Sequence, residues 1–375
     1  TSLEHLDLAG LPAGLTVVKK GTPIFPRLDM DAEIAYIKDQ MEANKPAIEK
    51  EWEPEEVELK LNRKEIKFDD FDKVDKSLPL YIPHYDFISS KICTQLKTLG
   101  YNAKVLEPTS KKSLTLGKDS TTSKEYVTFV SLLGDVLLFE KENPKSEDIK
   151  QLLLFQTEGS ETDGFYATVI RSKLDSIGRS DIHIIAPKLE QIIYQKKEYF
   201  DVFWNAVRHA DEMFEKYGFE KNQNNRSAET FYVTGNPQII LNRICNSHFF
   251  EYLKEKRMNF KCQSFKEYYL FMWMEKIRQE KNTSPEIKKR LKKLIKRTEI
   301  KRLRKIADKK VKLLTGANLR YRYAERTIFH KGCDATIELV PMYENGTSIL
   351  NMMKTEKKCK TPLFQMQFDG KENKT

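Results

Sequence analysis

The chain has 375 residues, of which 39% are hydrophobic, including 21 Phe and 16 Tyr. This composition excludes a disordered chain, and the length predicts two or three globular domains. No run approaches the roughly 20 apolar residues that a membrane span needs, and no charged-then-apolar signal segment opens the sequence. We therefore expect a cytoplasmic protein without a membrane partner.

The net charge of +10 comes from one stretch of the chain. The whole sequence holds 65 Lys and Arg against 55 Asp and Glu. Residues 281–312 carry fifteen of the basic and three of the acidic residues, so the rest of the chain is close to neutral. A basic stretch of this kind predicts either a solvated helix surface or contact with an anionic partner.

The five cysteines are scattered through the sequence, at Cys93, Cys245, Cys262, Cys333 and Cys359. No two of them are close in sequence. This spacing argues against a disulfide framework and against a local zinc site, and it favours a reducing compartment.

Residues 1–75 show no sheet pattern and predict a largely irregular or helical tail. Three prolines interrupt residues 11–29, and Asp31 then begins a helix with Ile34, Ile37 and Met41 on one side. Residues 42–75 are rich in acidic residues and are also interrupted by proline.

This tail resembles part of bacterial methionyl-tRNA synthetase. GTPIFPRLDMDAEIAYIKDQM is similar to the end of the anticodon-binding region, and EIKFDDFDKVD is similar to the opening of the appended OB-type tRNA-binding domain. The catalytic signatures of the HIGH and KMSKS types occur nowhere in the chain, so aminoacylation is excluded. The resemblance implies tRNA binding, and the alternative is a tail without function, which the residues favour.

From residue 78 onward, strands and helices alternate. The apolar patterns predict strands at 78–82 and 103–106 and helices at 86–99 and 124–140. Gly100 is expected to end the first of these helices. The Ser, Thr, Lys and Gly residues of 109–123 predict a loop.

The most informative unit is 149–187. It predicts a strand at 152–155, a polar loop at 156–164, and a second strand at 182–186. Thr162 or Asp163 is expected to begin a helix that Gly178 ends. The apolar residues that predict its inward face are Phe165, Val169, Ile170, Leu174 and Ile177. Such a loop lies at the carboxyl end of a parallel strand, where these sheets bind ligands.

A second alternating series follows a helical segment, 189–218, with Trp204 and Phe214 expected in the core. The predicted strands are 230–234, 259–262, 335–340 and 363–368. The predicted helices are 247–256, 265–279, 321–330 and 346–353, with a loop at 235–246. The fold class is therefore α/β, with two Rossmann-like parallel-sheet lobes and helical insertions. We predict domains at 1–75, 76–227 and 228–375, the last with a basic helical insertion at 281–315.

Residues 77–375 resemble the dehydratase-type region of 2-hydroxyacyl-CoA dehydratases, in particular the copy fused into CoA-enzyme activases. The stretches that carry the resemblance are LYIPHYDFISSKICTQLKTLGYNAKVLEP, SKEYVTFVSLLGDVL, LLLFQTEGSETDGFYATVIRSKLDSIG, VTGNPQIILNRICNSHFFEYLKEKRMNF and GCDATIELVPMYENGTSILNMM. That family holds a [4Fe–4S] cluster on cysteines. Here the matching positions are occupied by Tyr126, Glu161 and Glu344. A phenol and two carboxylates do not replace thiolates, so we predict no cofactor on this chain.

Three carboxylates near the predicted loop, with Glu344, raise an alternative. Oxygen ligands suit a hard cation if the two lobes face each other, whereas acidic residues at a helix start also simply complement the helix dipole. The second interpretation is favoured, and no metal site is predicted. The candidate cleft residues are His84, Tyr126, Glu158, Glu161, Asp163 and Glu344. No histidine has a partner at a recognisable triad or metal spacing.

The basic stretch predicts one or two amphipathic helices. Ile287, Leu291, Leu294, Ile295, Leu303, Ile306 and Val311 fall near one face. The candidate basic surface consists of Lys288, Lys289, Arg290, Lys292, Lys293, Lys296 and Arg297. No aromatic residue is interleaved for base stacking, so a solvated helix is favoured over RNA contact through 281–312.

Three functions remain open. The first is an accessory, non-catalytic module that supports a protein partner in a dehydratase or activase system. The second is a tRNA- or RNA-associated protein that uses the synthetase-like tail and the basic helices. The third is a metal-dependent enzyme built on the carboxylates.

Overall fold

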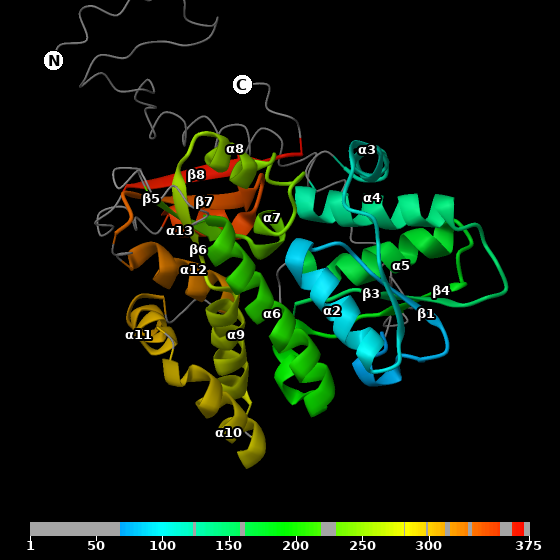
Figure 1. The fold of residues 1–375 in the computed structure, drawn as a ribbon, viewed down its shortest axis with the longest axis horizontal. Helices are drawn as coiled ribbons and strands as arrows, with labels where there is room; N and C mark the ends of the chain where they lie inside the picture. The colour runs from blue at the N-terminus through cyan, green and yellow to red at the C-terminus, as the bar shows by residue number, and fades with distance from the viewer. Residues whose placement is uncertain are drawn as a thin grey trace, which may run out of the picture. The chain divides into compact units, whose positions relative to one another are not determined.

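The computed structural model describes residues 68–122, 125–157, 162–218, 230–280, 282–297, 299–311, 316–328, 332–352 and 362–370 (Figure 1). Contacts divide the chain into two units, Thr1–Lys64 and Glu65–Thr375, and every described element belongs to the second. The helix predicted from Asp31 lies outside the described residues. The boundaries predicted at 76–227 and 228–375 stay a prediction.

The first sheet contains four parallel strands in the order β2-β1-β3-β4. Its strands are β1 (Pro79–Ile82), β2 (Asn102–Val105), β3 (Lys150–Leu153) and β4 (Ile182–Ile185). Its helices are α2 (Asp86–Thr98), α3 (Lys111–Asp119), α4 (Val127–Glu142), α5 (Tyr166–Ser176) and α6 (Lys197–Gly218). Short 3-10 helices occur at η3 (Phe71–Lys73), η4 (Thr162–Phe165) and η5 (Leu189–Tyr194).

The second sheet has the order β6-β5-β7-β8 and is also parallel throughout. Its strands are β5 (Thr230–Gly235), β6 (Asn259–Cys262), β7 (Ala335–Pro341) and β8 (Leu363–Phe368). Its helices are α7 (Pro237–Ile240), α8 (Phe249–Glu255), α9 (Phe265–Gln279), α10 (Pro285–Leu294), α11 (Ile300–Lys310), α12 (Ala317–Thr327) and α13 (Asn345–Met352), with η6 (Ile295–Arg297) after α10. The predicted α/β class with two parallel sheets is confirmed.

One continuous hydrophobic core joins the two sheets through α6 and α9, which run beside each other in Figure 1. Trp204 and Phe214 of α6 are both buried, as predicted. The ring of Trp204 lies 5.5 Å from that of Trp273 on α9, and the indole nitrogen of Trp273 donates to the carbonyl of Leu189 at 2.9 Å. A separate apolar cluster fills the other side of the first sheet, under α4 and α5.

The loop predicted at 109–123 is wrong, because residues 111–119 form α3. Ser110 and Ser113 form a capping box at its start. A Cβ atom on Gly117 would lie 2.0 Å from the Val130 carbonyl oxygen, so glycine permits a close approach of α3 to α4. Tertiary packing thus forms a helix from residues that favour a loop. The loop predicted at 235–246 likewise contains the short helix α7.

The inward face predicted for the helix after β3 is partly wrong. Ile170 and Leu174 are buried, but Phe165, Val169 and Ile177 are exposed. The helix proper begins at Tyr166, after one turn of 3-10 helix, and Tyr166 and Ala167 take the buried positions at its start. Gly100 and Gly178 have positive φ, as expected of residues that end helices.

Candidate functional site

The carboxyl ends of strands from both sheets meet at one hollow. Its walls include Tyr85 after β1, Phe155 and Thr157 after β3, and Asn236 after β5. Both sheets change direction of winding next to these strands, between β1 and β3 and between β5 and β7. Such switch points are where open α/β sheets bind ligands.

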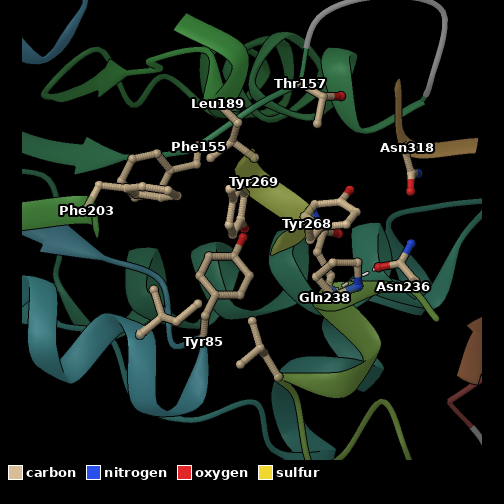
Figure 2. A pocket seen from close by; sticks show the side chains of 13 residues that line it. Tyr85, Phe155, Thr157, Leu189, Phe203, Asn236, Gln238, Tyr268, Tyr269 and Asn318 are labelled. Atoms are coloured by element: carbon tan, nitrogen blue, oxygen red, sulfur yellow. Dashed lines mark hydrogen bonds between the residues drawn. The ribbon is translucent and has the colours of Figure 1, made fainter. Parts of the chain in front are cut away.

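Helices close the rest of this hollow. Tyr268 and Tyr269 come from α9, Asn318 comes from α12, and Phe203 comes from α6 (Figure 2). The hollow contains a cavity of about 60 Å³ within a larger space of about 610 Å³ that opens to solvent. Its walls are aromatic, with a few amides. The sequence indicates a ligand site at strand ends but does not identify these residues, because they lie on helices far away in the chain.

Three of the predicted cleft residues lie near this junction. His84 lines a smaller cavity beside the hollow, and burial lowers its pKa. The hydroxyl of Tyr126, before α4, accepts a hydrogen bond at 3.0 Å from the backbone nitrogen of Asn345, which follows Glu344. The structure thus brings Tyr126 and the Glu344 turn together from different sheets. Their role in binding stays a prediction.

Glu344 is already held by the protein. Its carboxylate lies 2.7 Å from a guanidinium nitrogen of Arg322, and it accepts a hydrogen bond from the side-chain amide of Asn236 at 3.1 Å. Glu158 and Glu161 lie outside the described residues, as does the side chain of Asp163. Within the described ranges, no group of three or more His, Cys, Asp or Glu side chains is placed to hold a metal ion.

The Glu344 contact belongs to a buried ionic network in the second sheet. Arg322 and Arg326 of α12 both pair with Glu338, which lies in β7 and has no exposed surface. Burial would raise the pKa of Glu338, but the two guanidinium groups hold it at about 2. The network holds the turn after β7 against α12, so these buried charges have a structural role.

A buried carboxyl that sequence reasoning missed lies between the sheets. Asp135 of α4 accepts a hydrogen bond from the Thr109 hydroxyl at 2.6 Å, and that hydroxyl accepts one from the Asn242 amide at 2.9 Å. Burial raises the pKa of Asp135 to about 6, against the hydrogen bonds from Ser113 and Thr109. A single acidic residue in the apolar stretch VTFVSLLGDVLLF was the available signal.

The basic stretch forms α10, η6 and α11, as predicted. Leu291, Leu303 and Val311 are buried, and Ile287, Leu294, Ile295 and Ile306 pack partly buried against the core. We name the five exposed lysines of the first two elements the α10 lysines: Lys288, Lys289, Lys292, Lys293 and Lys296. Within the described part of the chain, none of them pairs with an acidic side chain.

Arg290 differs from these lysines. Its guanidinium donates to the carbonyl of Ile193 at 2.9 Å and lies 4.9 Å from the ring centre of Phe200. It therefore ties α10 to η5 and α6 and is not part of an open basic surface. The side chain of Arg297 is outside the described residues.

The four described cysteines are free thiols. Cys93 lies in α2, Cys245 follows α7, Cys262 ends β6, and Cys333 precedes β7. Burial raises the pKa of each, which disfavours the thiolate that binds metals. Cys359 lies outside the described residues.

Comparison with known proteins finds a match to one segment. A stretch of 75 residues, 20% of the chain, is 73% identical to the methionine–tRNA ligase of Streptococcus pneumoniae serotype 4. The ligase of Streptococcus pyogenes serotype M1 is 55% identical over 76 residues, and that of Lactiplantibacillus plantarum is 42% identical over 88 residues. Both matches also cover 20% of this chain.

The matched segment spans 11% to 13% of the length of these ligases. A methionyl-tRNA-synthetase-like segment of about 75 residues is thus confirmed. No protein-family model matches the chain, and the resemblance to the dehydratase-type region stays a prediction. None of the helices within the described ranges is both long and apolar enough to cross a bilayer.

Proposed function

We propose that this chain is an RNA-associated protein of the cytoplasm and that its preferred partner is a tRNA. The observation that carries the proposal is the 75-residue segment that is 73% identical to a methionine–tRNA ligase. Because the match spans only 11% of that ligase, the proposal is association with tRNA, without aminoacylation.

The α10 lysines supply a surface for the phosphates. Lys288, Lys292 and Lys296 are spaced four residues apart, as are Lys289 and Lys293, so each row follows one side of the helical segment. The opposite side is anchored in the core by Leu291. Five mobile ammonium groups on a fixed helix attract a polyanion without requiring a base sequence.

The end of the predicted tail is built into the α/β unit. Phe71 is buried, and its ring stacks on that of Tyr199 with centroids 4.9 Å apart. The side chain of Gln195 donates to Asp70 at 2.6 Å, and the amide nitrogen of Asp75 donates to the side chain of Gln151 at 2.8 Å. These contacts support the proposal that the segment and the α/β unit act as one protein.

The test is a titration of labelled methionine tRNA, followed by fluorescence anisotropy at several salt concentrations. We expect replacement of all five α10 lysines by glutamine to weaken binding at least tenfold. The slope of log K against log salt should become shallower by up to about 4, because each phosphate contact contributes about 0.7 to 0.9.

A matched control removes five exposed lysines on the helices and connecting segments around the first sheet: Lys97, Lys141, Lys145, Lys188 and Lys216. This variant has the same net charge as the α10 variant. Equal loss of binding in both variants would show attraction by net charge alone and would contradict the assignment to α10.

A second function rests on the architecture. This function is that of an accessory module of a dehydratase or activase system that acts with a cluster-bearing partner. The two parallel sheets, whose strand ends meet at one hollow, support it. Iron analysis and visible absorbance after anaerobic purification test whether this chain holds iron. Size-exclusion chromatography with light scattering, run on a mixture with a [4Fe–4S] dehydratase component, tests whether the two proteins form a complex. Separate elution of the two proteins would refute this function.

A further inference from the structure

The hollow between the sheets is lined mainly by aromatic and amide side chains. Its aromatic side chains are Tyr85, Phe155, Phe203, Tyr268 and Tyr269, and its amides are Asn236, Gln238 and Asn318. None of the described residues that line it carries a charge. In Figure 2, Tyr85 and Tyr269 point toward each other from opposite sides of the hollow.

Two of the amides differ in what they offer to a ligand. Asn236 is committed within the protein, because its oxygen accepts from the backbone of Gln238 at 2.9 Å and its nitrogen donates to Glu344. The side-chain oxygen of Asn318 is buried and has no hydrogen-bond partner among the described residues. An unpaired buried carbonyl costs free energy that a suitable donor recovers.

We propose that this hollow binds a planar ring compound that carries an N–H or O–H donor and no negative charge. The donor bonds to the side-chain oxygen of Asn318, and the ring lies against the aromatic walls. This inference does not depend on RNA association, which is placed on α10 and η6.

The same walls disfavour anions. A carboxylate or phosphate placed here meets no cation among the described lining residues. Burying an anion without a partner costs more than the ring contacts return. Aromatic faces and a carbonyl oxygen do not repel a cation in this way. The absence of negative charge is therefore the property that the site selects.

Four compounds of nearly equal shape test this selection on the full chain. Benzamide is neutral and has the donor; acetophenone is neutral and lacks it; benzoate is an anion; and benzamidine is a cation. We expect ligand-observed NMR to give a millimolar Kd for benzamide, about fivefold weaker binding of acetophenone, and at least tenfold weaker binding of benzoate. Benzamidine keeps the N–H donors and should bind about as well as benzamide.

The variant Asn318→Leu keeps the number and branching of the side-chain heavy atoms and removes the acceptor. We expect it to bind benzamide about as weakly as the wild type binds acetophenone, while acetophenone binding stays the same or improves. Its melting temperature should equal or exceed that of the wild type, because an unpaired buried oxygen is gone. Asn102→Leu, on the exposed side of β2, is the matched control and should change neither affinity.

Three results would overturn the proposal. Benzoate binding as tightly as benzamide would remove the selection against anions. Equal affinity of benzamide for the wild type and for a folded Asn318→Leu variant would remove the role of Asn318. No saturable binding of benzamide would remove the site.

Discussion

Glu325 offers a test of the buried electrostatics of α12. This carboxyl is buried, and its Oε1 accepts hydrogen bonds from the hydroxyls of Tyr232 at 2.5 Å and Tyr321 at 3.2 Å. No cation pairs with it among the described side chains. Burial raises its pKa to about 7, the two tyrosine hydroxyls oppose that shift, and the nearby Glu267 adds to it.

The effect on folding follows from the two protonation states. A carboxyl with a pKa of about 7 when folded and 4.5 when unfolded binds its proton more tightly in the folded protein. Its contribution to stability is therefore complete below pH 4.5 and is lost as the pH rises through 7. The loss is about 3 kcal/mol, from about 1.4 kcal/mol for each pKa unit.

The perturbation is Glu325→Gln, which keeps the acceptor oxygen and cannot ionise. Urea unfolding at pH 5, 6, 7 and 8 gives the free energy of unfolding of each protein. We expect the stability of the variant relative to the wild type to increase by about 2 to 3 kcal/mol between pH 5 and pH 8, because part of the loss lies below pH 5. Glu255→Gln, an exposed carboxyl on α8, is the matched control. A difference that stays constant from pH 5 to pH 8 would refute the reasoning.

Three further changes test other parts of the fold. Because burial raises the pKa of Asp135, the wild type should lose stability as the pH rises through 6, so that Asp135→Asn becomes more stable than the wild type by up to about 3 kcal/mol. Urea unfolding of both proteins at pH 4 and pH 8 measures this difference, and a variant less stable than the wild type at pH 8 would contradict it. Gly235→Ala should lower the free energy of unfolding by about 3 kcal/mol or more, because φ is +135° and the new Cβ would lie 2.0 Å from the Leu339 carbonyl oxygen. A decrease of less than about 1 kcal/mol in urea unfolding would be inconsistent with this geometry. Arg179→Ala should lower the free energy of unfolding by about 3 to 5 kcal/mol, because it leaves the carboxylates of Asp181 and Glu140 without this buried guanidinium. The melting temperature should fall strongly, and an unchanged melting temperature would disprove this.

The strands and most helices were predictable because their apolar residues are spaced by local geometry. The predicted bounds of β6, α9 and β8 agree with the structure, since turn residues or caps flank each clear pattern. The failure at α3 has a physical cause. Its residues favour a loop, and its packing comes from the facing glycines of α3 and α4, which no local pattern reveals.

The sequence indicates only where a candidate site lies in the fold, at the carboxyl ends of parallel strands, where the hollow is found. Tyr126 and the Glu344 turn contact each other, but they are not among the described residues that line the hollow. The chemistry was not predictable, because Glu344 is neutralised by Arg322 from a different element and Asn318 reaches the hollow from α12. Partners of buried charges are set by tertiary structure, so a list of acidic residues does not show which are available to a ligand.

Acetylation footprinting of lysines with and without methionine tRNA, read by mass spectrometry, locates the surface that binds the RNA. We expect tRNA to protect the α10 lysines several-fold while Lys141 and Lys145 stay reactive. Uniform reactivity of all these lysines in the presence of saturating tRNA would contradict it.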